Sequence, residues 1–299
     1  MMKNVIVTGA NGFIGSSLIK KLISKNINVV AVDISFNNSK LPESEAISKI
    51  EIGLEDIDDL LGKIPQREYD ALYHFAWAGV NGVEKANPIT QLKNAEMTMN
   101  CATICKKLGV NKLLCAGTIA ERATESLSLL HKTSGGMMYG VAKHATHLML
   151  ETYCKNIEQA FVWMQFSNIY GPENKTGNLV SYTIGELKKG NEASFGPALQ
   201  PYDFILVDDL IEAAVRLGEV KTTCNCYFIG SGKPRLLKDY LLEIGRLSGK
   251  EELIKIGLRA DDGVKYNLDM FDVSSLKKDI GEYISMSFNE GIKYTLENY

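Results

Sequence analysis

The sequence predicts an α/β fold in which a doubly wound parallel sheet is joined to a smaller C-terminal lobe. Over the first 170 residues, short and almost continuously apolar runs alternate with amphipathic segments. This alternation is typical of a parallel sheet that is covered by helices on both faces. A glycine-rich turn directly follows the first apolar run. Because 299 residues are enough for two lobes, we expect residues 1–170 to form the sheet domain and residues 171–299 the smaller lobe, partly interleaved with the first.

The elements of the first region follow in order from hydrophobic periodicity. Each predicted strand is an apolar run bounded by turn residues, and the runs are 4–10, 28–35, 70–79, 112–118 and 160–171. Amphipathic spacing predicts helices at 15–26, from about 88 to 108 and from about 139 to 156. Pro88 is suited to a first helical turn, where its missing N–H costs nothing.

The second region mixes helices, strands and turn-rich loops. We expect helices at 179–190 and 236–249, a strand leading into a helix within 195–217, and a strand at 224–232. Strands of this region are expected to pair with the main sheet. The two parts would then be lobes around a cleft.

Composition excludes several classes of protein. A net charge of −3 argues against a nucleic-acid binder and against a polybasic membrane anchor. No run approaches about 18 apolar residues, and the first apolar run is broken at Thr8 and Gly9, too early for a signal peptide. The six cysteines lack metal-ligand spacing, so we expect no metal site and reduced, buried thiols in a cytoplasmic protein, with Cys224 and Cys226 on one face of a strand.

The segment "VTGANGFIG" (7–15) predicts a dinucleotide site. Gly9, Gly12 and Gly15 follow a strand and open a helix, the context in which a Rossmann-type fold holds a pyrophosphate at a helix N-terminus. Asp33 ends the next strand, where a carboxylate can accept hydrogen bonds from the adenosine ribose. It would repel a 2′-phosphate, and the nearest following cation is Lys40. We therefore expect NAD as cofactor, with NADP as the alternative.

Further motifs connect the chain to a known family. They are Tyr139-x-x-x-Lys143, "HFAWAG" (74–79), "NAEMTMN" (94–100), "FSNIYGP" (166–172), "YDFILVDDL" (202–210) and a late arginine, Arg259. Together with the glycine spacing, they resemble the extended short-chain dehydrogenase/reductase family, in its nucleotide-sugar epimerase/dehydratase branch. The likeness covers almost the whole chain.

The resemblance implies an active site, a cofactor site and a substrate lobe. The catalytic residues would be Thr118, Tyr139 and Lys143, with the Lys143 ammonium and the positive nicotinamide lowering the pKa of Tyr139. Implied cofactor-binding residues are Gly9, Asn11, Gly12, Phe13, Ile14, Gly15, Asp33, Phe75, Ala76, Trp77, Asn94, Tyr139, Lys143 and Ile169. A nucleotide-diphosphate sugar would be bound by Thr118, Asn168, Tyr202 and Arg259.

Departures from the family pattern narrow the expected reaction. Dehydratases carry an Asp-Glu pair after the catalytic threonine, whereas this chain has Ile119 and Ala120, and Glu121 comes one residue too late. Tyr202 stands where the family has an arginine. We expect an NAD-dependent epimerase that oxidises and re-reduces the sugar at C4. The alternatives are an NAD(P)H-dependent 4-ketoreductase of a nucleotide-linked 4-keto-6-deoxyhexose and a non-catalytic dinucleotide sensor.

The family typically dimerises through two helices of each subunit, here those at about 90–108 and 139–156. We therefore expect a homodimer, with Met149, Leu150, Tyr153 and Cys154 as apolar surface beyond the catalytic face. Of the histidines, His144 and His147 are expected to serve packing or the dimer face. His74 is expected to be structural.

Overall fold

The computed structural model describes residues 1–124, 137–174, 176–261 and 266–299. Within these ranges, seven parallel strands form the main sheet in the order β11-β6-β5-β4-β1-β2-β3. These strands are β1 Asn4–Thr8, β2 Asn28–Asp33, β3 Ile47–Glu51, β4 Ala71–His74, β5 Lys112–Thr118, β6 Phe161–Phe166 and β11 Cys226–Ile229. The predicted fold class is confirmed, and β11 joins the main sheet from the second region as expected.

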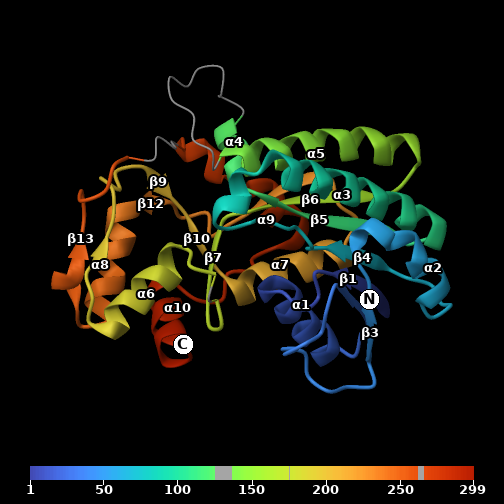
Figure 1. The fold of residues 1–299 in the computed structure, drawn as a ribbon, viewed down its shortest axis with the longest axis horizontal. Coiled ribbons are helices and arrows are strands. Elements are labelled where there is room, and N and C mark those ends of the chain that lie inside the picture. Colours follow the sequence, from blue (N-terminus) through green and yellow to red (C-terminus); the bar gives the residue numbers. More distant parts are fainter. Residues whose placement is uncertain (125–136, 175, 262–265) are drawn as a thin grey trace.

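Helices cover both faces of this sheet (Figure 1). On one face lie α1 Phe13–Ser24, α7 Val207–Glu219 and α9 Ser274–Ile280. The other face is covered by α2 Leu60–Lys63, α3 Pro88–Leu108 and α5 Met137–Asn156. The alternation of strand side chains determines the two cores: Val5 and Val7 pack toward α1, whereas Ile6 packs toward α3.

A third apolar cluster fills the smaller part of the molecule, seen beside the sheet in Figure 1. Its helices are α6 Leu179–Lys189, α8 Leu237–Leu247 and α10 Phe288–Glu297. Three two-stranded sheets accompany them: β7 Asn168–Tyr170 with β10 Phe204–Leu206, β9 Pro201–Tyr202 with β12 Arg235–Leu236, and β8 Ala193–Ser194 with β13 Ile254–Lys255. Shorter helical turns are η1 Leu54–Asp59, η2 Val83–Ala86, α4 Ala120–Thr124, η4 Glu251–Leu253 and η5 Leu268–Phe271.

Local signals explain the helix that was placed most accurately from the sequence. Helix α3 begins at Pro88, and the Asn87 side chain accepts hydrogen bonds from the N–H groups of Ile89 and Thr90 at 3.0 and 3.3 Å. It ends at Gly109, whose φ of 64° is left-handed and favours glycine. Both ends are therefore encoded by residues next to the helix.

Several predicted strand boundaries are wrong because tertiary contacts end the strands earlier. The predicted strand 160–171 divides at Ser167, whose hydroxyl donates to the Asp203 carbonyl at 2.8 Å, so residues 168–170 pair with β10 instead. The predicted strands 70–79 and 224–232 shorten to β4 and β11. Strand β3 was not predicted, because it is a half-exposed edge strand without an apolar run.

The cysteine and helix-surface expectations need correction. Cys224 is exposed and lies outside β11, and Cys226 is only half-buried, whereas the other four cysteines are buried. Leu150 and Cys154 belong to the core between α5 and the sheet, and are not apolar surface. The hydroxyls of Tyr153 and Thr103 hydrogen-bond at 2.9 Å across to α3. None of the described helices is long and apolar enough to cross a membrane.

Candidate active site

The glycine loop between β1 and α1 is shaped by close backbone approach. Gly9 has a φ of +68°, and an added Cβ would lie 2.6 Å from the backbone nitrogen of Ala76. An added Cβ on Gly15 would lie 2.1 Å from the Gly9 carbonyl oxygen. Helix α1 begins after Gly12 without a side-chain cap, so its first N–H groups are available to an anion. This cradle fits the pyrophosphate of a dinucleotide.

Acidic side chains end β2 and β3 beside this loop. The two oxygens of Asp33 accept hydrogen bonds from the backbone N–H groups of Asn11 and Ile34, each at 2.8 Å. A carboxylate has about four acceptor positions, so capacity remains for ribose hydroxyls. Glu51 pairs with Asp33 in the register of the two strands and accepts from the Phe36 N–H at 2.8 Å. Glu51 could not be predicted as a site residue, because the sequence of β3 carries no apolar run that would indicate a strand.

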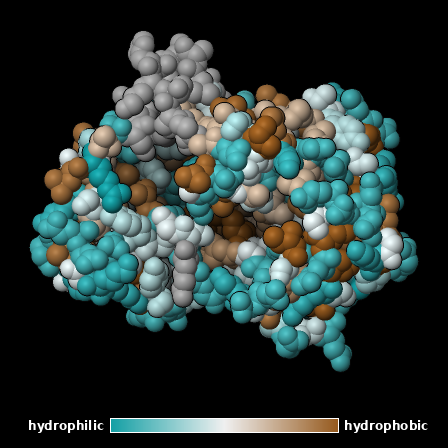
Figure 2. All heavy atoms as spheres, in the orientation of Figure 1, coloured by the Kyte–Doolittle hydropathy of each residue, from teal (hydrophilic) through white to brown (hydrophobic). Residues whose placement is uncertain are grey.

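A cleft of about 660 Å³ lies at the carboxyl ends of the central strands, between the sheet and the smaller part. Figure 2 shows the surface hollowed between these two parts. Of the residues predicted from the sequence, those lining the cleft are Phe13, Ile14, Phe75, Trp77, Thr118, Tyr139, Lys143, Asn168, Ile169, Tyr202 and Arg259. The fold thus brings catalytic, cofactor-binding and substrate-binding candidates into one space.

Tyr139 lies at the start of α5, and its ring contacts the Trp77 ring edge-to-face at 6.2 Å between centroids. Burial raises the pKa of Tyr139, the Glu121 carboxylate raises it further, and a hydrogen bond with Thr118 lowers it. The lowering of the Tyr139 pKa expected from Lys143 is therefore not seen, and burial and Glu121 raise this pKa instead. Tyr139 is held as the protonated phenol.

Lys143 is buried one helical turn beyond Tyr139. Its Nζ donates to the Ala116 carbonyl at 2.6 Å and lies 3.6 Å from the centroid of the Trp77 ring. Burial lowers the pKa of Lys143 to about 7, against an opposing effect of Glu121. The charge of this ammonium is therefore sensitive to pH near neutrality.

Close packing of α5 on the loop after β5 brings both side chains to the cleft. An added Cβ on Gly140 would lie 2.7 Å from the Ala120 carbonyl oxygen. The Thr118 hydroxyl accepts a hydrogen bond from the Ala120 N–H at 3.2 Å, so its own proton can be donated into the cleft, where Tyr139 lies. A substitution at Gly140 would push the helix away from Thr118.

The opposite wall of the cleft carries polar groups from the smaller part. The Tyr202 hydroxyl donates to Asn168 Oδ1 at 2.9 Å. Arg259 is exposed, donates from Nη2 to the Tyr182 hydroxyl at 2.7 Å, and stacks on that ring at 5.0 Å. A side pocket of about 250 Å³ adjoins the cleft and shares Leu179, Tyr202 and Arg259 with it. The pocket extends the cleft beyond Thr118, Tyr139 and Lys143.

Some predicted residues have other positions. The side-chain amide of Asn94 is buried and exchanges two 2.8 Å hydrogen bonds with the backbone of Ala78, so it holds the loop after β4 and does not line the cleft. His74 hydrogen-bonds to Thr8 and Thr98 at 2.8 and 3.0 Å, and burial lowers its pKa to about 3. It is a structural residue, as predicted.

Lys85 and Tyr182 are among the cleft-lining residues that were not predicted from the sequence. Lys85 reaches the cleft from η2, with its Nζ 5.3 Å from the centroid of the Tyr139 ring. Tyr182 lies on α6 and orients Arg259. Neither belongs to a recognisable motif, and only the folded chain brings them to the cleft.

The fold and the cleft define a dinucleotide-dependent protein with a Thr-Tyr-Lys constellation. Residues 5–229 match the model of the NAD dependent epimerase/dehydratase family. The chain belongs to this family, and NAD is its cofactor.

Individual relatives are distant. UDP-glucose 4-epimerase of Mycolicibacterium smegmatis is 24% identical, covering 76% of this chain and 77% of the relative. CDP-abequose synthase of Salmonella typhimurium is 26% identical, covering 98% and 97%. The structure of UDP-glucose 4-epimerase from Thermotoga maritima, solved with UDP-glucose, shares the fold, with a TM-score of 0.81 at 23% identity and coverage of 99% and 98%.

Proposed function

We propose that this protein is an NAD-dependent nucleotide-sugar 4-epimerase that works through a 4-keto intermediate. One observation carries the proposal: Thr118, Tyr139 and Lys143 face Asn168, Tyr202 and Arg259 across a single cleft. A sugar at the catalytic wall would place its diphosphate toward Arg259, the residue type suited to bidentate binding of phosphate. The adjoining side pocket would then receive the nucleoside.

The residues of the cleft divide the proton chemistry among them. With NAD bound, the positive charges of the nicotinamide and of Lys143 would stabilise the phenolate of Tyr139, which would accept the proton of the C4 hydroxyl during oxidation and return it to the ketone during reduction, while Thr118 would donate a hydrogen bond to the same oxygen. Bound NAD would supply the acceptor and donor of the hydride. Lys143 supplies positive charge beside the phenol and can donate to the hydroxyls of the nicotinamide ribose.

Dehydration is disfavoured by the loop after Thr118. Ile119 packs in an apolar cluster and is buried. The Glu121 carboxylate is also buried, does not line the cleft, and is occupied by N–H donors from three residues. Within its described residues, 119–124, this loop therefore offers no carboxylate to the sugar.

The 4-ketoreductase is the second candidate, because Tyr202 replaces an arginine in the substrate wall and its hydroxyl is directed to Asn168. Both reactions use the same catalytic residues. They differ in how cofactor is used: epimerisation recycles bound NAD, whereas reduction consumes reduced cofactor at each turnover.

The cofactor content of the purified protein, followed by a turnover assay, distinguishes these reactions. Bound NAD, together with interconversion of a nucleotide-linked hexose and its C4 epimer without added cofactor, is the result expected for the epimerase. An empty site, with NADH or NADPH consumed in proportion to a nucleotide-linked 4-keto-6-deoxyhexose, would favour the reductase. Cofactor binding without turnover of any nucleotide sugar would favour a sensor and contradict both enzymes.

Cofactor preference gives a direct prediction for Asp33. NADP would bring its 2′-phosphate against the Asp33 carboxylate, with Glu51 on the neighbouring strand. The lost acceptor and the added repulsion are worth on the order of 2–3 kcal/mol, or roughly 30- to 150-fold in affinity. Asp33→Ser should remove most of this preference, mainly by strengthening NADP binding. Calorimetric titration of both nucleotides measures it, and equal affinities in the wild type would contradict the argument.

We also propose that the protein is a homodimer built on α3 and α5. The described surface of these helices exposes large apolar side chains, Leu148 and Met149 among them at 52% and 46%. Sedimentation at micromolar concentration should give twice the chain mass, and Leu148→Glu should shift the protein toward monomer. A monomeric wild type would exclude this assembly.

A further inference from the structure

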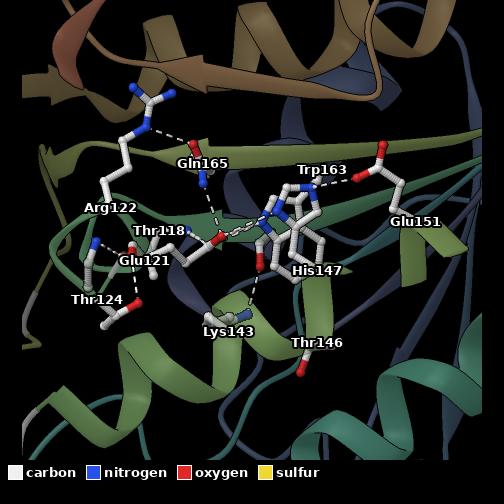
Figure 3. Close-up of polar contacts among 12 residues, drawn as sticks. Thr118, Glu121, Arg122, Thr124, Lys143, Thr146, His147, Glu151, Trp163 and Gln165 are labelled. Carbon is white, nitrogen blue, oxygen red and sulfur yellow. Dashed lines mark hydrogen bonds and ion pairs between the residues drawn. The ribbon is translucent and has the colours of Figure 1, made fainter. Parts of the chain in front are cut away.

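Glu121 is a buried acidic side chain near the cleft, with none of its surface exposed. Figure 3 shows its carboxylate at the centre of a group of polar side chains behind Thr118. Oε1 accepts from the Thr118 backbone N–H at 2.6 Å, and both oxygens accept from the Trp163 indole N–H, at 3.0 and 2.9 Å. Oε2 also accepts from the Gln165 amide at 3.1 Å.

Two histidines of α5 lie beside this carboxylate. His147 stacks parallel on Trp163 at 5.1 Å, with its Nδ1 3.7 Å from Glu121 Oε2. Ligating atoms of Glu121, His144 and His147 lie within 4.8 Å of one another. A metal ion there would have to displace the N–H donors that already occupy the carboxylate. The arrangement is therefore better suited to holding a charge in place than to binding a metal.

We propose that Glu121 is a positioning residue for the catalytic group: its carboxylate fixes the backbone at Thr118 and faces Lys143 and Tyr139 as a buried negative charge. The inference rests on the roles proposed for those three residues. Glu121 itself does not line the cleft and would touch neither substrate nor cofactor.

The positioning part follows from how tightly the loop closes on the carboxylate. An added Cβ on Gly117 would lie 2.7 Å from Glu121 Oε1 and 2.3 Å from Trp163 Nε1. The Thr118 N–H donates a hydrogen bond to Glu121, and the Thr118 hydroxyl accepts one from the Ala120 N–H. The direction of the hydroxyl into the cleft is thereby determined.

The negative charge of Glu121 affects whether Lys143 and Tyr139 are protonated. Lys143 Nζ lies 5.7 Å from the centroid of the Trp163 ring, whose indole N–H donates to Glu121, and the Glu121 carboxylate raises the pKa of both Lys143 and Tyr139. It therefore favours the ammonium of Lys143 against the cost of burial, and it favours the phenol of Tyr139. Loss of this charge should lower both pKa values together.

Other titratable or charged groups surround Glu121 and could alter its effect. From the elements packed around it, these are Tyr139, Lys143, His144 and His147 on α5, Cys115 on β5, Arg122 on α4 through Gln165, and Glu151 through His147. The His147 Nε2 lies 3.9 Å from Glu151 Oε2. Glu151 is half-exposed, so it provides a matched carboxylate on the far side of His147.

The experiment compares Glu121→Gln with Glu151→Gln. Both variants remove one carboxylate charge from beside His147, but Glu151 does not contact Thr118. Lys143 is titrated by NMR with ¹³C-labelled lysine, using Lys143→Met to assign its signal. In Glu121→Gln we expect the pKa of Lys143 to fall by about 1 pH unit or more, and turnover to fall at least about tenfold. Glu151→Gln should match the wild type in both.

Glu121→Asp separates the positioning of Thr118 from the effect of the negative charge on Lys143. It is also the variant to use if Glu121→Gln does not fold. It keeps the charge but shortens the reach to Thr118, so Lys143 should titrate as in the wild type while turnover falls. The proposal would be overturned if Lys143 had the same pKa in Glu121→Gln and in Glu151→Gln. It would also be overturned if Glu121→Asp kept wild-type turnover. Stoichiometric zinc that is lost in Glu121→Gln would overturn it as well. The titration of Lys143 needs no substrate. A failure of the proposed 4-epimerase reaction could therefore be told apart from a failure of the Glu121 proposal.

Discussion

Replacing Tyr139 by phenylalanine is expected to slow hydride transfer by at least about 100-fold, the range for a lost general acid–base. Only the hydroxyl is removed, and the ring contact with Trp77 can persist. Folding and NAD affinity should therefore change little. A single-turnover measurement of the absorbance of the reduced cofactor, after addition of a nucleotide sugar, tests the chemical step alone.

Tyr153→Phe is the matched control, because it removes the same atom from the same helix. The Tyr153 hydroxyl hydrogen-bonds with Thr103, and Tyr153 does not line the cleft. Its single-turnover rate should equal that of the wild type. A Tyr139→Phe rate close to the control would remove Tyr139 from the mechanism.

Replacing Lys143 by methionine is expected to weaken NAD binding and slow the chemistry together, because one ammonium serves both. Hydrogen bonds from a charged donor contribute about 1.5–3 kcal/mol each, so the affinity should fall roughly 10- to 150-fold. Titration with NAD by calorimetry measures the binding, and single-turnover kinetics measures the chemistry. Unchanged cofactor affinity would show that the ammonium does not reach the cofactor.

The affinity for NAD is expected to fall as the pH rises, because it depends on the charge of Lys143. Burial lowers the pKa of Lys143 to about 7, so the ammonium is present below that pH and is lost as the pH rises through it. Wild-type affinity for NAD should therefore weaken between about pH 6 and 8, whereas the affinity of Lys143→Met should stay flat. Lys155→Met, an exposed lysine near the end of the same helix, should retain the wild-type profile.

Much of the cofactor site was predictable because its signals are local. The glycine spacing follows from contacts within the turn between β1 and α1, such as Gly15 against Gly9. Asp33 ends its strand, where a parallel sheet presents ligands. Tyr139 and Lys143 share a helix face by their spacing alone. The sequence by itself thus determined the fold class and the candidates of the catalytic wall.

Tertiary structure decided the features that depend on contacts between distant segments. Edge strand β3 pairs with β2, and this pairing brings Glu51 beside Asp33. Asn94 is directed to Ala78 by the packing of α3 on the loop after β4, away from the cleft. These side chains are placed by partners far along the chain, so no spacing in the sequence indicates them.

The environment of the catalytic group shows the same division. Spacing in the sequence puts Tyr139 beside Lys143, but the pKa values of both side chains depend on burial and on Glu121, which lies one residue too late for the acidic pair of a dehydratase. The Glu121 carboxylate acquires its role from Trp163 and Gln165 on β6, more than 40 residues away. Residue identity and spacing determined which groups are present, whereas desolvation and distant hydrogen-bond partners, which exist only in the folded chain, decided how those groups hold their protons.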